Sequence, residues 1–159
     1  MSFEPAIREG GCRCGRLRFE ISAPPLLTMA CHCTGCQRMT GSAFSLSVAI
    51  PSSGFAIISG EPVIGGLKGV PEHFFCPQCF SWAFTRPPKF VGDFVNVRQT
   101  LIDEVDPRPP FIETWTSEKL DWASTSAVHS FSGFPPPESF PGLLAEFAAR
   151  DGRQSAAPI

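Results

Sequence analysis

The sequence predicts a mainly β domain of many short strands, with one short helix near the C-terminus. Seventeen prolines and fourteen glycines among 159 residues favour short strands joined by turns over long helices. Hydrophobic residues make up 43% of the chain and charged residues 18%, which is typical of a folded globular protein. This length suits a single domain over residues 1–159, with a core expected at about 10–135.

Alternation of apolar and polar side chains predicts the strands, because successive residues of a strand face opposite sides. Within residues 16–21, Leu17, Phe19 and Ile21 would face the core, and the charged residues between them would face solvent. Similar patterns predict further strands at residues 44–50, 55–59, 93–100 and 111–116. Short apolar runs that flank clusters of cysteines lie at 26–30, 73–75 and 81–85.

The segments between these strands are expected to be loops or single turns. Residues 1–10 have the character of a loose lead-in, and residues 60–69 that of a glycine-rich loop. Residues 34–41 are polar and end in glycine, which predicts a turn or a single helical turn. The serine-rich segment 122–134 has no periodic pattern and is left unassigned.

The one clear helix is expected at about 140–151. Ser139 is a suitable N-cap, and Pro141 would lie near the first turn, where proline is tolerated. Apolar residues, among them Phe147, then follow helical spacing, and Gly152 is expected to end the helix.

Charge and hydropathy indicate neither a nucleic-acid nor a membrane partner, and the protein is expected in the cytoplasm. The net charge of −2 offers no general attraction to nucleic acid or to an anionic membrane. No run approaches the roughly 18 apolar residues of a membrane helix, and the first residues lack the pattern of a signal peptide. Thiols stay reduced in the cytoplasm, so the cysteines are interpreted as metal ligands or reactive thiols.

Seven cysteines occur in three clusters with metal-ligand spacing. Both C-x-C and C-x-x-C spacings bring two sulfurs onto one metal ion, and zinc is the expected metal. Because seven is odd, a complete disulfide framework is impossible. The clusters are Cys12 with Cys14, then Cys31, Cys33 and Cys36, and finally Cys76 with Cys79.

Counting ligands divides the seven cysteines into four and three. A structural zinc takes four protein ligands, whereas a catalytic zinc keeps one position open. The middle cluster is compact enough to supply three sulfurs by itself, which leaves the first and last pairs to share the other ion. A single metal site with free thiols is the alternative. His32 lies between two expected ligands and would point the opposite way, so it is not counted.

An open site of three thiolates favours sulfur chemistry over hydrolysis. Three thiolates more than cancel the charge of Zn²⁺, which leaves a poor Lewis acid for water but one that still binds thiols well. Such a site suits the making or breaking of carbon–sulfur bonds.

The cysteine motifs resemble those of the glutathione-dependent formaldehyde-activating enzyme (GFA) family. The similarity extends over about residues 10–125. It rests on Gly11-Cys12-x-Cys14-Gly15, Cys31-His32-Cys33-x-x-Cys36-Gln37, Phe75-Cys76-x-x-Cys79, Thr40-Gly41, Phe44, Leu101-Ile102-Asp103 and the segment 109–122.

The resemblance implies a β-tent of stacked antiparallel sheets, the fold of Mss4-like proteins. It also implies that Cys12, Cys14, Cys76 and Cys79 hold a structural zinc, and that the middle cluster surrounds the reactive zinc. The implied activity is that of a carbon–sulfur lyase, adding a glutathione-like thiol to an aldehyde such as formaldehyde, as in the synthesis of S-(hydroxymethyl)glutathione. The oligomeric state is not indicated.

Substrate-binding residues and one turn are less well defined. Arg38, beside the middle cluster, and Arg13 are candidates for contacting the carboxylates of glutathione. Many relatives carry glycine where this chain has Phe80, so the turn after the last cysteine is expected to differ.

Two other functions fit the same motifs. A non-catalytic zinc scaffold that binds proteins is the main alternative, and a thiol redox enzyme, which needs a free low-pKa cysteine, is the second. An open site is also expected to lose its metal readily, leaving the middle cluster empty or oxidised to a disulfide.

Overall fold

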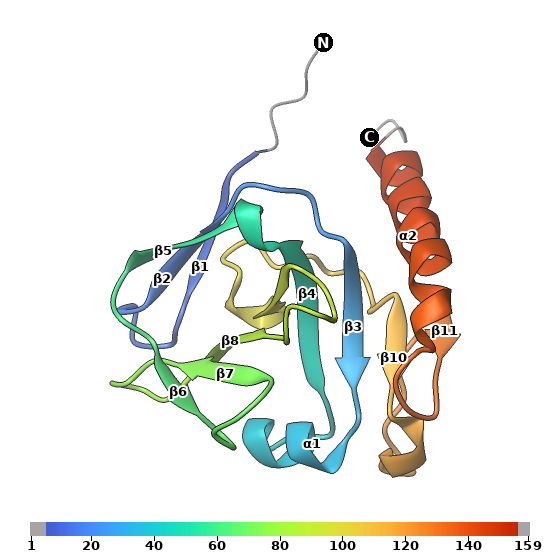
Figure 1. Ribbon diagram of the computed structural model, residues 1–159, viewed down its shortest axis with the longest axis horizontal. Helices are drawn as coiled ribbons and strands as arrows, with labels where there is room; N and C mark the ends of the chain where they lie inside the picture. The colour runs from blue at the N-terminus through green and yellow to red at the C-terminus, as the bar shows by residue number, and fades with distance from the viewer. Residues whose placement is uncertain (1–5, 156–159) are drawn as a thin grey trace.

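The computed structural model describes residues 6–155 and contains two sheets beside a long C-terminal helix (Figure 1). One sheet has the strand order β1-β2-β5, and the other has the order β11-β10-β3-β4-β9-β8-β7-β6. This confirms the predicted mainly β class. The strands are β1 Arg8–Gly11, β2 Arg18–Ile21, β3 Leu27–Cys31, β4 Ser45–Pro51, β5 Phe55–Ser59, β6 Val63–Gly65, β7 Glu72–Phe75, β8 Trp82–Arg86, β9 Phe94–Arg98, β10 Ile112–Thr114 and β11 His129–Ser130.

Antiparallel pairing predominates, with two exceptions at one edge of the larger sheet. Strand β10 runs parallel to β3 and to β11. A parallel pair needs a long connection, and the chain between β3 and β10 contains most of the other strands. The two parallel pairs therefore result from the order in which the chain visits the strands, and local sequence patterns do not predict that order.

The main core lies where the two sheets pack together. Leu17, Phe19 and Ile21 are buried there, as the alternation predicts, against residues of the large sheet such as Phe84 and Val97. Each contributes roughly 1.5–3 kcal/mol by its burial. Strand β4 lies between β3 and β9 and is covered on both faces near its end, so its expected one-sided pattern does not hold there.

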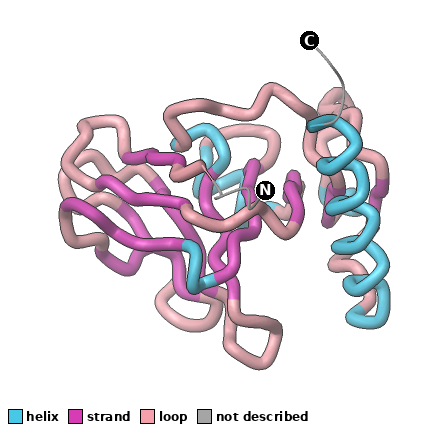
Figure 2. Tube along the Cα trace, turned by 90° about the horizontal axis from the view of Figure 1, so that it is seen from above, coloured by secondary structure: helices cyan, strands magenta, loops and turns pink. Residues whose placement is uncertain are grey.

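Helix α2, Phe140–Ser155, packs against the other side of β3 and β10. Leu143 and Phe147 contact Leu27, Phe111 and neighbouring residues in a second core. Figure 2 shows the helix along one side of the molecule, with the strands filling the other side. The helix continues through Gly152, so the prediction that this glycine ends it was wrong.

Three segments that are expected to be loops, or that the sequence leaves unassigned, contain short strands. Residues 8–10 of the expected lead-in belong to β1, the glycine-rich loop contains β6, and the unassigned serine-rich segment contains β11. These strands have two to four residues, and none of them alternates between apolar and polar side chains, so periodicity does not detect them. Residues 1–5 of the lead-in lie outside the described part of the chain.

The polar segment after the second cysteine cluster forms helix α1, Thr34–Thr40. Gly41 ends it in the left-handed conformation with φ 61°, and its N–H donates to the carbonyl of Gln37. Glycine adopts this conformation at little cost, which explains why the helix stops there. Within the described chain, no helix is both long and apolar enough to cross a membrane.

Candidate metal centres

Four cysteines come together from two turns that are far apart in the sequence. The Sγ atoms of Cys12, Cys14, Cys76 and Cys79 all lie within 4.8 Å of one another. Two of the separations are 3.5 Å, between Cys12 and Cys14, and 3.8 Å, between Cys14 and Cys76. A tetrahedron with Zn–S bonds of about 2.3 Å has edges of about 3.8 Å, so these sulfurs fit a zinc ion.

Backbone hydrogen bonds shape both turns of this four-cysteine group. The N–H of Gly15 donates to the carbonyl of Cys12 at 3.0 Å, and the N–H of Phe80 donates to the carbonyl of Cys76 at 2.9 Å. Phe80 has φ 57°, so the turn keeps the left-handed backbone that glycine favours, in spite of the phenylalanine. In this turn an L-residue therefore bears the strain of the left-handed conformation.

The protein holds this group ready to bind a cation. A hydrogen bond from the Ser81 hydroxyl, with an O–S distance of 3.2 Å, lowers the pKa of the Cys79 thiol to about 5. The same serine accepts a hydrogen bond from the N–H of Arg13 at 3.1 Å and so connects the two turns. A metal ion here would join the N-terminal strands to the β7–β8 hairpin.

The second group is formed by Cys31, Cys33 and Cys36, whose Sγ atoms also lie within 4.8 Å of one another. Cys31 ends β3, Cys33 is the N-cap of α1, and Cys36 lies in the first turn of that helix. The Cys33 sulfur accepts a hydrogen bond from the N–H of Cys36 at 3.3 Å. All three side chains are half-buried free thiols.

Within this group the thiols share their charge unequally. Hydrogen bonds from Cys36 and then from Thr114 lower the pKa of Cys31 to about 5, although burial opposes the shift. The pKa of Cys36 is raised, first by its hydrogen bond to Cys31 and then by burial. An anionic sulfur is therefore available for a soft cation such as Zn²⁺.

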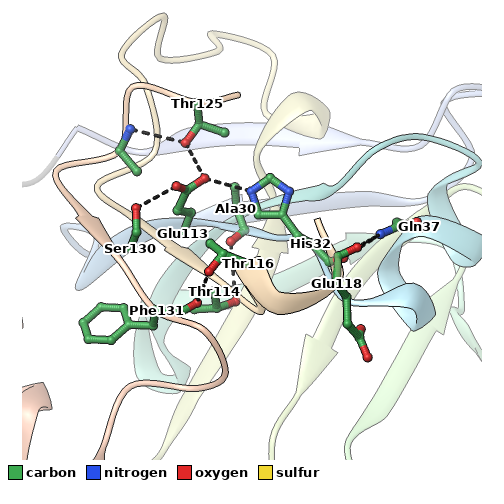
Figure 3. A network of polar contacts seen from close by, with 11 residues as sticks. Ala30, His32, Gln37, Glu113, Thr114, Thr116, Glu118, Thr125, Ser130 and Phe131 are labelled. Carbon is green, nitrogen blue, oxygen red and sulfur yellow. Dashed lines mark hydrogen bonds and ion pairs between the residues drawn. The ribbon is translucent and has the colours of Figure 1, made fainter. Parts of the chain in front are cut away.

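His32 belongs to neither group, and its ring is engaged elsewhere. Its Nε2 lies 2.8 Å from Oε2 of the buried Glu113 (Figure 3). The same carboxylate accepts hydrogen bonds from Thr125 at 2.8 Å and from Ser130 at 2.6 Å. Burial alone would raise the pKa of Glu113, but hydrogen bonds from Ser130, His32 and Thr125 lower it. The network thus attaches the cysteine loop to the segment around β11.

The amide of Gln37 fixes the other side of the same loop. Its Nε2 donates to the carbonyls of His32 and Glu118, at 2.7 Å and 3.0 Å (Figure 3). The Glu118 carboxylate in turn accepts from the N–H of Thr34 at 2.7 Å. The backbone that carries the three cysteines is therefore fixed from both sides.

One arginine that the sequence did not single out, Arg98, lies near this group, and two arginines that it did single out lie at the surface. Arg98 and Trp82 are buried together, with the guanidinium Cζ 3.9 Å from the indole centroid. Arg13 and Arg38 are exposed, and neither side chain makes a hydrogen bond or ion pair within the described residues. Nothing in sequence spacing distinguishes a buried arginine from an exposed one.

Comparison with known proteins agrees with the cysteine motifs. The model of the family described as glutathione-dependent formaldehyde-activating enzyme matches residues 7–118. The chain belongs to this family. All seven cysteines of this GFA protein lie within the matched range.

A solved structure supports the fold alone. A crystal structure of a Rhodobacter sphaeroides protein is 19% identical to this GFA protein, with a TM-score of 0.52. The alignment covers 63% of this chain and 92% of the Rhodobacter chain.

Proposed function

We propose that this GFA-family protein is a zinc-dependent carbon–sulfur lyase with two zinc sites. It would join a small thiol such as glutathione to an aldehyde such as formaldehyde, or release the thiol again. The observation that carries the proposal is the group of three clustered thiols with no fourth side-chain ligand among the described residues.

The two groups suit different roles. Cys12, Cys14, Cys76 and Cys79 would complete a tetrahedron and hold a structural zinc. Cys31, Cys33 and Cys36 would hold a reactive zinc and leave one position open. His32, the histidine between Cys31 and Cys33, is not part of this group and its Nε2 is engaged by Glu113.

Bound zinc would favour the ionised form of a substrate thiol near neutral pH. In the addition, the thiol sulfur forms a bond to the aldehyde carbon, the carbonyl π pair moves to oxygen, and the thiol proton ends on that oxygen. The protein would contribute a fixed cysteine loop, held by Gln37 and by the His32–Glu113 contact. Such fixed positioning lowers the entropic cost of bringing two small reactants together.

Zinc content and turnover, measured on the same preparations, test the proposal. Protein purified under reducing conditions is expected to hold two zinc ions per chain, and Cys33→Ser to hold one. Loss of activity toward glutathione and formaldehyde should accompany the loss of that zinc. Ser42→Ala, at an exposed position just after α1, is the matched control and should keep both zinc ions and full activity.

Other results would favour the alternatives. Two zinc ions without turnover of any small thiol would favour a protein-binding scaffold. One zinc ion in both wild type and Cys33→Ser would mean that the middle cluster is a set of free thiols, and a redox function would then be favoured. All seven cysteines fall in the two groups, so full zinc occupancy would leave none for redox chemistry. A reducing compartment such as the cytoplasm would suit these thiols.

A further inference from the structure

One cation is buried near the three-cysteine group without an acidic partner. Arg98, the last residue of β9, is 7% exposed. Within residues 6–155, no carboxylate lies at ion-pair distance from its guanidinium. Its Nε has no hydrogen-bond partner, and its Nη2 donates to the carbonyl of Asn96 at 3.3 Å. An unpaired buried charge is costly, so an arginine in this position calls for a nearby anion.

The strand register places Arg98 on the same sheet face as Cys31. Cys31 lies opposite Ser45 in the β3–β4 pair, and Ser47 lies opposite Arg98 in the β4–β9 pair. Directly opposed residues share a face, and so do residues two apart on one strand. The side chains of Cys31, Ser45, Ser47 and Arg98 therefore lie on one face of three adjacent strands, with Cys31 and Arg98 in neighbouring cross-strand rows.

The electrostatics agree with this placement. Burial lowers the pKa of Arg98 to about 10, while the negative charges of Cys36 and Cys31 oppose that shift. The guanidinium therefore stays charged near neutral pH. Cysteines of the cluster are thus the sources of negative charge that act on Arg98.

Trp82 fixes the guanidinium in this position. The indole is 8% exposed, and the guanidinium carbon lies 3.9 Å from the ring centroid, which is close for a cation–π contact. Since the contact restricts the plane of the guanidinium, its charge is not free to turn toward solvent.

Charge balance shows what this arginine could do in the proposed function. Three thiolates and one Zn²⁺ sum to −1. A neutral fourth ligand leaves that charge unchanged. A thiolate makes the site more negative, with a net charge of −2 in a partly buried position. We propose that Arg98 supplies the positive charge that lets the three-cysteine zinc site accept an anionic thiolate as its fourth ligand. This inference rests on the proposed function and assigns Arg98 as a positioning residue that selects the charge of the ligand.

Ligand binding to the cobalt-loaded protein tests the inference without an activity measurement. Co²⁺ replaces Zn²⁺, and the protein is titrated at one fixed pH with 2-mercaptoethanol, which binds as a thiolate, and separately with neutral imidazole. Binding is measured from the sulfur-to-cobalt charge-transfer absorption. Arg98→Met is expected to weaken 2-mercaptoethanol binding by roughly 10- to 100-fold, the scale of one partly buried charge pair. Imidazole binding should change by less than about threefold, because no charge is added.

Two further variants separate charge from packing. Arg98→Lys keeps the charge but loses the planar stack on Trp82, and it should bind 2-mercaptoethanol within about threefold of wild type. Arg86→Met removes another arginine that stacks on aromatic rings, those of Phe55 and Phe84. Arg86 is the matched control, and both titrations should be unchanged.

The possible failures are distinguishable. If wild type binds no thiol, the proposed function and this inference both fall. If wild type binds thiol but Arg98→Met binds it equally well, or loses thiol and imidazole to the same extent, only the inference is overturned. Should Arg98→Met fail to fold, a tenfold loss of thiol affinity in Arg98→Lys would overturn it instead.

Discussion

Replacing Phe80 by glycine should stabilise the protein, because this residue has φ 57°. The left-handed conformation costs an L-residue about 1–2 kcal/mol. Glycine avoids that cost but adds about 0.5–1 kcal/mol of chain entropy to the unfolded state. The ring is 71% exposed, so its removal costs little. The expected net gain for Phe80→Gly is about 0.5–1 kcal/mol.

Urea unfolding of the reduced, zinc-loaded protein measures this gain. The midpoint temperature should also rise, by about 1–4 °C for a chain of this length. Phe80→Ala is the control, since it removes the ring but keeps the Cβ atom and therefore the strain. If the alanine variant gained as much stability as the glycine variant, or if glycine destabilised the protein, the strain argument would be refuted.

Three further predictions concern the Glu113 network, acid stability and metal retention. Glu113→Gln should lower the free energy of unfolding by about 1–3 kcal/mol, because a buried network loses a charged acceptor. Urea unfolding measures this change, with Glu138→Gln at an exposed position as the control. The ion pair with Arg108 lowers the pKa of Asp106. Its contribution to stability should therefore be complete above about pH 4 and fall away at lower pH, and Asp106→Asn should flatten the acid limb of a stability–pH curve. A chelator should remove zinc in a fast and a slow phase, and Cys33→Ser should lack the fast one; equal phases in both proteins would contradict an open site.

Much of the fold followed from local pattern. The alternation in residues 16–21 identified the buried side chains of β2, and the strand at Phe55–Ser59 has the bounds that its pattern predicts. The short strands β1, β6 and β11 could not be found in this way, because their residues do not alternate between apolar and polar and their pairing depends on distant neighbours. The end of the helix was also mispredicted, at Gly152, because tertiary packing was not visible in the sequence. The packing of Phe147 and Leu143 outweighs the weak helix propensity of one glycine.

The sequence by itself determined that seven thiols occur in metal-ligand spacing, and the structure brings together the same groups of four and three that ligand counting proposed. Spacing within a turn is a local property, so it can be read without a fold. Only the tertiary structure decided that His32 pairs with Glu113, that Arg98 is buried on the face of Cys31, and that Phe80 bears a left-handed backbone. Each of these depends on strand order and packing across tens of residues, which fix the direction and burial of a side chain and leave no trace in the spacing of its neighbours.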